Sequence, residues 1–552
     1  MPRLPAKALL AITAVATLII LPMLYRGNAS GHDMQFHVAS WMDVAQQWRQ
    51  GVLYPRWAAG ANYGFGEPRF IFYPPISWLA GAALGSVLPW RVVPGALIWL
   101  TLVLAGLSMW RLARSGLPET DAILAAVFFA ANPYTLMVVY FRSDYAELIA
   151  AALFPLLVLG ILRIAANDRK AIAGTAVVFA AIWLSNAPEA VLASYSAAAL
   201  LVVLSVIKKS LAPVLAGGAA LAAGLGLAAY YILPAAYEQR WVDIGQVLSI
   251  ELKPVENFLF THADNPEFVW FNWRMSMIAC LMLSATAIAA VFTARRRRAA
   301  PEVWWTLAAL TALIVCLMSR YSLPVWDHLP KLRFVQFPWR WLGPLAVPCS
   351  IFLAMGFSGL RKKWLAWIGV WAVLAILLNV MILTAWWDNQ DIPDLKRAIA
   401  SGQGYEGTDE YAALGGDRTD LPMDAPHASA VNDDGDPIDA SDGVRLHVQG
   451  WDAEEKHIGV ESKVPLNLAP KLEYFPAWHV DVNGRPATAI PAQDTAQLLV
   501  PLQPGTYQVD IRMAHAWDRT AGGLISAFTA ASMLGWALAV ARRRRIGALP
   551  TS

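Results

Sequence analysis

Long apolar blocks separated by short polar stretches dominate the chain, and this pattern predicts a polytopic α-helical membrane protein. The blocks have about 18 to 24 residues, the length that a helix needs to cross the hydrocarbon core of a bilayer. They occur near residues 8–25, 74–90, 92–113, 119–139, 146–165, 171–187, 188–207, 211–235, 273–293, 302–320, 338–359, 364–387 and 520–541.

Basic residues indicate which of these blocks cross the membrane. Clusters of Arg and Lys near residues 111–114, 163–170, 208–209, 295–298, 361–363 and 542–545 are expected on the cytoplasmic side. All six fall on that side only if one block between residues 26 and 113 does not cross. The block 73–90 is short and opens with Pro74-Pro75, so we expect it to lie at the outer surface as a juxtamembrane or re-entrant segment.

The resulting topology has about 12 transmembrane helices and both termini inside. It predicts a transmembrane domain over residues 1–387 with outer loops 26–91 and 236–272, and an outer segment 388–519. Residues 520–552 then form the final transmembrane helix and a basic cytoplasmic tail.

The segment 388–519 differs in kind from the rest of the chain. Its first part, to about residue 440, is rich in Asp, Gly and Pro and is typical of an irregular linker. Short alternating runs follow, among them VRLHVQ, HIGVES, WHVDVNG, QLLVPL and TYQVDIRM, with Asn483-Gly484 as a hairpin turn. The pattern predicts a small extracytoplasmic β-sandwich-like domain before the last helix.

Composition supports the membrane class and excludes two others. Apolar residues make up 57% of the chain and charged residues 15%, and the mean hydropathy is +0.44. A net charge of +3 is too small to indicate a nucleic-acid partner. The three cysteines all lie inside apolar blocks, which excludes a disulfide framework or a cysteine metal site.

Three acidic sites fall on the outer face in this topology. Asp33 and His37 are one helical turn apart, which places both on one helix face. Asp144 and Glu147 stand at the start of a span in FRSDYAELIA, and Asn186 and Glu189 at a tight turn in SNAPEA. The structural alternatives are a solvated helix end for Asp33 and helix N-caps for the other two pairs.

Carboxylates gathered at an outer cavity suit either of two chemistries. Asp33, Asp144 and Glu147 offer the hard oxygen ligands that a divalent cation such as Mg²⁺ or Mn²⁺ prefers. One of them instead can remove a proton from an acceptor group. Both chemistries suit a substrate whose leaving group is a phosphate.

Such a substrate also needs cations near the lipid headgroups. The stretch KLRFVQFPWRW places Arg333 and Arg340 at the outer start of a span, and Arg142 lies on the same face. Arginine offers a planar fork suited to phosphate oxygens. The alternative is that Arg340 snorkels to lipid headgroups between Trp339 and Trp341, which resemble interfacial belt residues.

The chain resembles the GT-C superfamily of polyprenyl-phosphate-sugar-dependent glycosyltransferases. The resemblance rests on an outer loop that begins with an Asp, on GVLYPRW, NYGFGEP and FYPP within residues 51–75, and on RSDYAE after the third span. EGTDEY and EYFPAWHVDVNG make it similar, more closely, to the bacterial YfhO-type membrane proteins and those described as 6-pyruvoyl-tetrahydropterin-synthase-related.

The resemblance implies an enzyme of the bacterial inner membrane whose active site and β domain are extracytoplasmic. It would move a sugar from a polyprenyl-phosphate carrier to an envelope glycan or lipid acceptor. Asp33 takes the place of the catalytic Asp, Asp144 and Glu147 that of the second acidic motif, and Arg340, helped by Arg333, that of the group that meets the lipid phosphate. A non-catalytic envelope assembly factor and a lipid-linked-glycan transporter remain alternatives.

Overall fold

The computed structural model describes residues 4–546 except 263–264, 296–300, 358–362, 418–419, 439 and 515. Within this part, nine helical segments are long and apolar enough to cross a membrane, or up to eleven if each of two bent helix pairs counts as one span. The nine are Ala6–Arg26, Trp90–Ala113, Glu119–Arg142, Tyr145–Ala165, Ala187–Lys208, Pro266–Thr293, Pro338–Phe357, Trp367–Thr384 and Trp517–Leu538. The protein is therefore a polytopic helical membrane protein, as the sequence predicts.

The predicted count of twelve spans is not reproduced in full. Two predicted spans are bent pairs, Ala212–Leu227 with Ala229–Trp241 and Pro301–Leu317 with Arg320–His328, which turn by 71° and 84°. A further predicted span, 171–187, is the helix α9 (Lys170–Trp183) of only 14 residues. The block at 73–90, which we expected not to cross, contains α4 (Pro75–Gly85), whose 11 residues are too short to span a bilayer.

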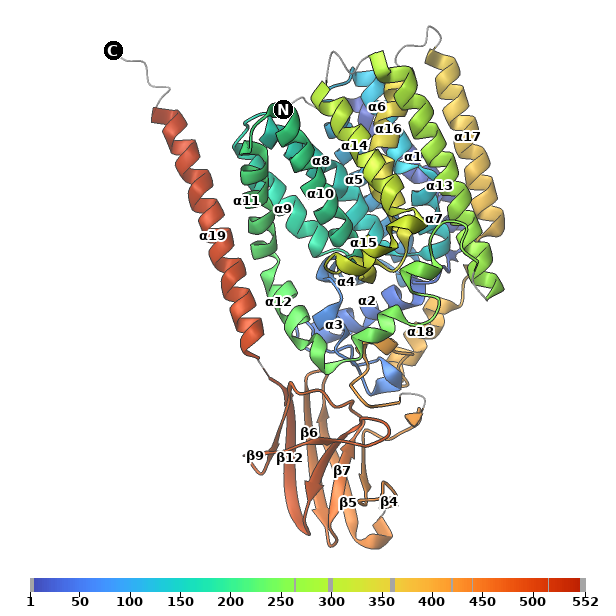
Figure 1. Ribbon diagram of the computed structural model, residues 1–552. Helices are drawn as coiled ribbons and strands as arrows, with labels where there is room; N and C mark the ends of the chain where they lie inside the picture. Colours follow the sequence, from blue (N-terminus) through green and yellow to red (C-terminus); the bar gives the residue numbers. More distant parts are fainter. Residues whose placement is uncertain are drawn as a thin grey trace.

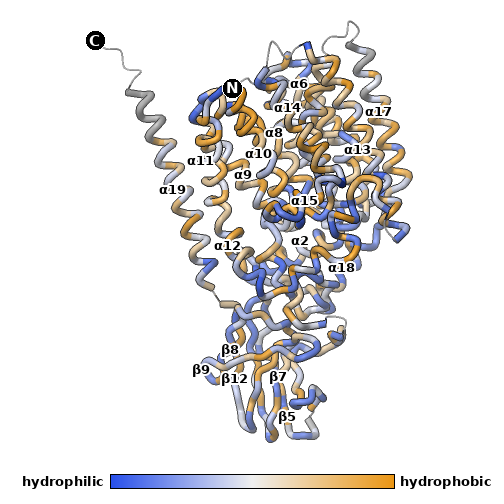
Figure 2. The backbone as a smooth tube through the Cα atoms, in the orientation of Figure 1, coloured by the Kyte–Doolittle hydropathy of each residue, from blue (hydrophilic) through white to orange (hydrophobic). Residues whose placement is uncertain are grey.

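The helices form one bundle above a β domain (Figure 1). Its long members are α1 (Ala6–Arg26), α5 (Val93–Ala113), α6 (Glu119–Ala130), α8 (Tyr145–Ala165), α10 (Ala187–Lys208), α11 (Ala212–Leu227), α13 (Pro266–Thr293), α14 (Pro301–Leu317), α16 (Leu342–Phe357), α17 (Lys363–Thr384) and α19 (Trp517–Ile546). Figure 2 shows apolar residues throughout the bundle and hydrophilic ones in the band around α2 and α18 and in the β domain. The basic residues predicted at 296–298 and 361–362 and the tail 547–552 lie outside the described residues.

Short helices form the layer between the bundle and the β domain. They are α2 (Met34–Arg49), α3 (Arg69–Phe72), α4, α12 (Ala229–Glu238), α15 (Leu323–His328) and α18 (Asp391–Ala400). A two-residue strand pair, β1 (Asn28–Ala29) with β2 (Trp387–Asp388), joins the end of α1 to the segment after α17. The first outer loop is thereby fixed to the chain that leads into the β domain.

The β domain consists of two antiparallel five-stranded sheets, in the orders β10-β11-β7-β3-β4 and β5-β6-β12-β8-β9. Residues from both sheets share one hydrophobic core, which makes the domain a sandwich. The strands are β3 (Ala428–Val431), β4 (Pro437–Ile438), β5 (Val444–Trp451), β6 (Glu455–Ser462), β7 (Leu466–Pro470), β8 (Trp478–Val482), β9 (Arg485–Ala487), β10 (Ile490–Pro491), β11 (Leu498–Leu502) and β12 (Gly505–Met513).

The predicted hairpin turn at Asn483-Gly484 is confirmed. It joins β8 to β9, and both residues have positive φ, 52° and 70°, as a two-residue turn of type I′ requires. All five alternating runs of the sequence lie in strands. They account for β5, β6, β8, β11 and β12. The stretch from 388 to about 440 contains α18, β3 and β4, so the expectation that all of it is an irregular linker is wrong.

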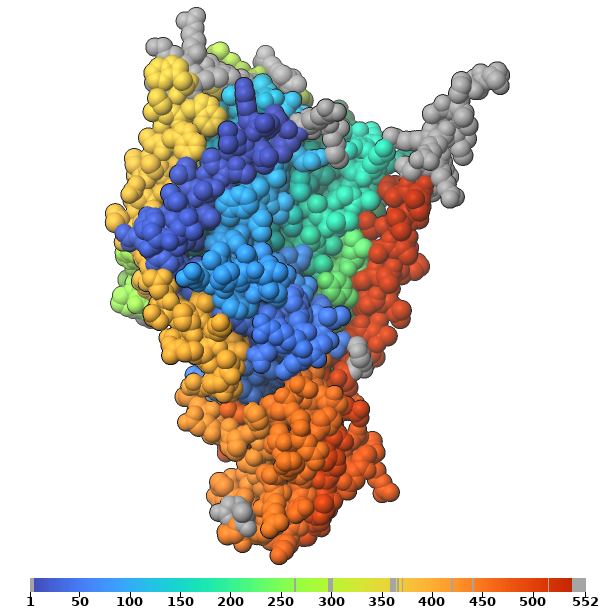
Figure 3. Space-filling view, turned by 180° about the vertical axis from the view of Figure 1, so that it is seen from behind, coloured from blue at the N-terminus to red at the C-terminus, as the bar shows by residue number. Residues whose placement is uncertain are grey.

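The β domain is joined to the first outer loop by buried polar contacts. Glu67 accepts hydrogen bonds from the backbone N and the Oγ1 of Thr408, both at 2.9 Å. Glu473 accepts from the backbone N of Ala413 at 2.8 Å and from Nδ2 of Asn62 at 3.3 Å. We call this set of contacts the junction. Seen from behind, the β domain is a separate lobe that meets the helical body at this loop (Figure 3).

Candidate functional site

The candidate site lies where two helices begin, at the end of the bundle that faces the β domain. The span that starts at Glu119 ends in a π-helical turn, Val138–Arg142. Ser143 follows in the left-handed region, with φ of 52°, and α8 begins directly after Asp144. This reversal presents Arg142, Asp144 and Glu147 on one side of a tight turn. π-Helical turns occur frequently at functional sites.

A second segment, residues 29–33, lies directly against this turn. The backbone N of His32 donates to the carbonyl of Phe141 at 3.1 Å, and the backbone N of Asp33 to that of Arg142 at 2.8 Å. Gly31 passes so close that a Cβ there would lie 2.6 Å from the carbonyl oxygen of Phe141. These contacts fix the start of α2 and place the side chain of Asp33 beside Arg142.

Three carboxylates converge on the guanidinium of Arg142. Its Nη2 lies 3.2 Å from Oδ2 of Asp33 and 3.1 Å from Oδ2 of Asp144, and its Nη1 donates to Oε2 of Glu147. The side chains of Arg142, Asp144 and Glu147 are at most 5% exposed, whereas that of Asp33 is 38% exposed. Asp33 is therefore the carboxylate of this group that a substrate can reach.

A second arginine completes the cluster from a distant part of the chain. Nε of Arg340 donates to Oε2 of Glu147 at 3.2 Å, and Nη1 donates to the carbonyl of Val335 at 2.9 Å. Its Nη2 lies 3.8 Å from Oδ2 of Asp144, beyond hydrogen-bonding distance. Arg340 is buried, as are Trp339 and Trp341 beside it. The snorkelling alternative is therefore wrong for Arg340, and the two tryptophans are not belt residues.

His37 approaches the cluster from α2. Its Nε2 lies 3.5 Å from Oδ1 of Asp144, and its Nδ1 lies 3.3 Å from Oγ of Ser77. Burial alone would raise the pKa of Asp144, but the nearby imidazole of His37 and the charge of Arg142 hold it well below its usual range. Asp144 therefore stays ionised at any physiological pH.

Asp144 is also a helix cap. Its Oδ1 accepts from the backbone N of Glu147 at 2.9 Å, which is the N-cap bond of α8. The structural and the chemical interpretations of this residue thus hold together, because each oxygen of the carboxylate has a different partner. Asn186 caps α10 in the same way, through the backbone N of Glu189 at 3.0 Å.

Glu147 and Glu189 form the buried floor of the site. Tyr134 donates to Oε1 of Glu147. Glu189 is 2% exposed, and its Oε1 has no hydrogen-bond partner among the residues that the structure describes. Glu189 and Tyr134 both lie beside Gly343, where an added Cβ would be 3.3 Å from Oε1 of Glu189 and 3.7 Å from Cε1 of Tyr134.

The structure brings together Asp33, His37, Arg142, Asp144, Glu147 and Arg340 from three separate segments of the sequence. We call these six residues the charged cluster. Arg333 is not part of it, because it is exposed and its guanidinium lies 5.2 Å from the ring of Phe334 instead. The chemical roles assigned from the sequence remain predictions.

The carboxylates do not fit a bound cation in this arrangement. The guanidinium of Arg142 lies at the point on which Asp33, Asp144 and Glu147 converge. Within the described ranges, no group of three or more His, Cys, Asp or Glu side chains is arranged to hold a metal ion. A metal would have to displace Arg142, so the predicted role of the three carboxylates as ligands stays a prediction.

Sequence reasoning missed two supporting residues. Gly31 is required by the close approach to Phe141, and Tyr134 orients Glu147. Gly31 directly precedes His32 and Asp33, and a glycine next to a functional motif is a signal of close backbone approach. Tyr134 carried no such signal, since its contact with Glu147 depends on how the π-helical turn folds back.

Comparison with known proteins identifies the family. Two structures of the Archaeoglobus fulgidus oligosaccharyltransferase are similar to the chain. The apo form has a TM-score of 0.39 and 12% identity over 72% of this chain and 56% of that one. The complex with an inhibitory peptide and a dolichol-phosphate has a TM-score of 0.38 and 14% identity over 73% and 56%.

The chain thus spans just over half of the length of those proteins, and a likeness at this level carries no argument about function. No protein of curated function gives a significant match. Residues 70–390, more than half of the chain, match the family described as "6-pyruvoyl-tetrahydropterin synthase related domain; membrane protein". The chain belongs to this family of 6-pyruvoyl-tetrahydropterin-synthase-related membrane proteins.

Proposed function

We propose that the protein is a glycosyltransferase that takes a sugar from a polyprenyl-phosphate carrier and gives it to an envelope glycan or lipid acceptor. The observation that carries this proposal is the charged cluster, in which one accessible carboxylate lies above two buried guanidinium groups. A base for the acceptor and cations for a phosphate leaving group are the two parts that such a transfer needs.

In the proposed reaction, an acceptor hydroxyl oxygen attacks the anomeric carbon of the donor sugar. The bond between that carbon and the phosphate oxygen breaks, and polyprenyl phosphate leaves with the electron pair. Asp33 takes the proton of the acceptor hydroxyl. The configuration at the anomeric carbon inverts, because attack and departure occur on opposite faces.

Arg340 is the group that we assign to the departing phosphate. Two of its three nitrogens already donate to Glu147 and Val335. Nη2 lies beyond hydrogen-bonding distance of Asp144, and it is the donor that a phosphate oxygen would take. Fixed cations beside a developing negative charge in a water-poor site give large rate effects.

Arg142 has a positioning role in this proposal. It bonds Asp33, Asp144 and Glu147 at once, so it holds the base and the floor of the site in one geometry.

The first experiment measures transfer from a radiolabelled polyprenyl-phosphate sugar by purified protein. Asp33→Asn should lower the rate at least about 100-fold with unchanged expression and apparent Tm. Asp394→Asn, at an exposed carboxylate on α18, is the matched control and should keep full activity. Full activity of Asp33→Asn would overturn the proposal and favour a non-catalytic assembly factor.

The second experiment separates the arginine from a metal. Arg340→Lys should already lower both polyprenyl-phosphate binding and transfer, since a point charge replaces a planar fork poorly. Chelator should leave the rate unchanged if Arg142 takes the place of a cation. Loss of activity with EDTA and rescue by Mg²⁺ or Mn²⁺ would instead assign Asp33, Asp144 and Glu147 as ligands.

We also propose that the chain lies in the bacterial inner membrane with the charged cluster and the domain 388–519 on the outer side. Basic clusters near the opposite end of the spans support this orientation. The exposed hairpin turn offers a test through Asn483→Cys. A membrane-impermeant thiol reagent should label this variant in intact spheroplasts, and labelling only after the membrane is opened would contradict the orientation.

A further inference from the structure

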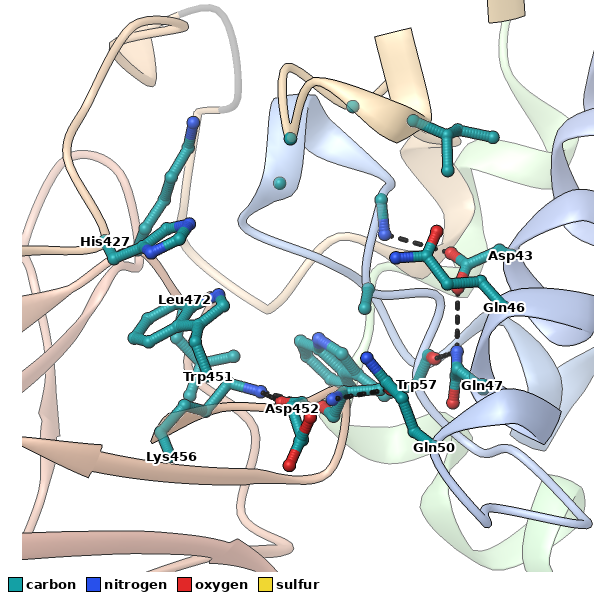
Figure 4. A pocket seen from close by; sticks show the side chains of 18 residues that line it. Asp43, Gln46, Gln47, Gln50, Trp57, His427, Trp451, Asp452, Lys456 and Leu472 are labelled. Carbon is teal, nitrogen blue, oxygen red and sulfur yellow. Dashed lines mark hydrogen bonds between the residues drawn. The ribbon is translucent and has the colours of Figure 1, made fainter. Parts of the chain in front are cut away.

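A second site candidate lies away from the charged cluster, between α2 and the β domain. A cavity of about 120 Å³ opens there, lined on one side by α2 and on the other by β5 and the start of β6 (Figure 4). At about 30 Å³ for each water it holds roughly four waters, which is room for part of a sugar ring that enters from the open side. The proposed function given above does not use this cavity.

Its two walls differ in chemistry. The wall from the β domain is aromatic, since the ring of His427 stacks on that of Trp451 with centroids 4.7 Å apart and an angle of 4° between the planes. The wall from α2 consists of the amides of Gln46, Gln47 and Gln50, which Figure 4 shows opposite the stacked rings.

The amide wall has unused hydrogen-bonding capacity. Gln47 is 1% exposed and donates to Asp43 and to the carbonyl of Trp57, both at 2.8 Å. Its Oε1 has no hydrogen-bond partner in the described part of the chain. A buried polar atom without a partner is rare in a native structure and indicates a missing ligand or water.

Three of the charged side chains that line the cavity, Asp43, Lys456 and Lys471, have partners within the protein, and the carboxylate of Asp452 also lines it. Nζ of Lys471 donates to the carbonyl of Met423 at 3.1 Å. Asp43 accepts from Gln47, from the backbone N of Gly60 at 2.9 Å and from the hydroxyl of Tyr405 at 2.8 Å. Nζ of Lys456 donates to the carbonyls of Asp452 and Ala453, at 2.5 and 2.7 Å. The cavity therefore suits a ligand that is neutral and rich in groups that both donate and accept.

We propose that this cavity binds one neutral sugar residue of the acceptor glycan, which rests on the glycosyl transfer proposed above. A pyranose has an apolar C–H face for the His427–Trp451 pair and a rim of hydroxyls for the amides of α2. Each hydroxyl both donates and accepts, as does each Gln side chain, so the pairing needs no net charge.

The position of the cavity supports an acceptor rather than a donor. Asp33 and Gln46 are at opposite ends of the same helix, and 13 residues at 1.5 Å per residue correspond to about 20 Å. A glycan of a few residues spans that distance. One residue would be held at the cavity while a residue further along the same glycan reaches Asp33.

The test is binding, which does not depend on catalysis. Saturation-transfer difference NMR is recorded on the full chain in a detergent without a sugar headgroup, with methyl α-glucoside, methyl α-mannoside, methyl β-galactoside and N-acetylglucosamine as probes. At least one probe should give a signal that falls about fivefold or more in Gln46→Trp, which fills the cavity. The matched control is Arg49→Ala on the same helix, outside the cavity, and it should leave the signal unchanged.

The outcomes separate this inference from the proposed function. Asp33→Asn should keep the signal of the probe while it loses transfer, because Asp33 does not line the cavity. If no probe gives a signal, or if Gln46→Trp retains the signal of the wild type, the inference is overturned. If Asp33→Asn keeps full transfer while Gln46→Trp loses binding, the proposed function fails and the sugar site stands.

Discussion

At the scale of single residues, the site depends on one close approach that only glycine permits. Gly31 lies where a Cβ would come within 2.6 Å of the carbonyl carbon and oxygen of Phe141 and 2.7 Å of Oγ of Ser143. Contact this short with backbone atoms is not relieved by a side-chain rotation. An added methyl group would push the 29–33 segment away and take Asp33 with it.

Gly31→Ala should therefore lower glycosyl transfer about 10- to 100-fold although it changes no charged group, since small misplacement of a catalytic group has effects of that order. The measurement is the initial rate of transfer together with the yield of folded protein in detergent. Gly174→Ala, in α9, is the control because a Cβ there meets nothing within 4 Å. Equal rates for both variants would mean that the segment adapts.

Asp144 allows its two roles to be separated by substitution. Asn is as good an N-cap as Asp, so Asp144→Asn should keep the bond to the backbone N of Glu147 and lose the charge that faces Arg142 and His37. We expect at least a tenfold loss of transfer together with a lower apparent Tm, because the buried guanidinium of Arg142 loses one of its ionised partners.

Asn265→Asp is the matched reverse exchange, at the cap of α13 outside the cluster, and it should affect neither quantity. Transfer that is retained in Asp144→Asn despite a lower Tm would assign the charge of Asp144 to stability alone.

At the scale of elements, the sequence predicted most of what periodicity governs. The strands of the five alternating runs, the hairpin at Asn483-Gly484 and the non-crossing segment at 73–90 are present, whereas β3, β4 and α18 lie in the stretch expected to be irregular. Period-2 alternation and block length depend only on local residues, so a single sequence carries them. The bends at 228 and after 317 were not predicted, because they depend on packing against other helices.

Part of the charged cluster could be predicted from local sequence as well. Asp33, His37, Asp144 and Glu147 stand at helix starts on one face of the membrane, which topology alone brings near one another. The pairing of Arg142 with all three carboxylates depends on the π-helical turn and on Ser143 in the left-handed region. Neither feature has a periodic signature. From the sequence, Arg142 is therefore assigned to the phosphate of the substrate rather than to the three carboxylates.

Strand β6 contains a buried lysine whose titration should be measurable. Burial lowers the pKa of Lys456 to about 7, against about 10.4 in an unfolded chain. Between these values the unfolded chain binds a proton that the folded chain does not, so stability should rise as pH increases from 7 towards 10.

Lys456→Met keeps the length of the side chain and removes the titrating amine, and with it this pH dependence of the stability. The apparent Tm of the variant should be higher than that of the wild type at pH 6, and the difference should shrink by pH 9. Lys463→Met, at an exposed position after β6, is the control. A difference that stays constant with pH would show that Lys456 remains protonated in the folded state.

At the scale of the whole molecule, α19 is held to the rest of the protein through its first half, where Oγ of Ser526 accepts from the backbone N of Tyr230 at 2.9 Å and donates to the carbonyl of Gly226 at 3.1 Å. Only 6% of its apolar segment is buried, but Arg519 at its start forms two hydrogen bonds with Glu238 of α12, at 2.8 and 2.9 Å. Glu238 is completely buried. This ion pair therefore ties the last helix, and the end of the β domain before it, to the bundle.

Arg519→Ala should destabilise the protein by about 3 to 5 kcal/mol, because it leaves a buried carboxylate without its partner. Thermal unfolding in detergent and protease sensitivity near residue 515 are the measurements. Arg512→Ala removes an exposed pair with Asp481 and should have little effect. The double variant Glu238→Leu with Arg519→Met should recover part of the loss, which a purely steric role of Arg519 would not permit.

The junction between the first outer loop and the β domain has a consequence for biogenesis. Asp43 bonds Tyr405, which is 362 residues further along the chain, and Glu67 bonds Thr408 across 341 residues. At about 5 to 20 residues per second, synthesis of that interval takes roughly 20 to 70 seconds. During this time the first outer loop lacks both partners, so its contacts with the segment that leads into the β domain form only after residue 408 has been made.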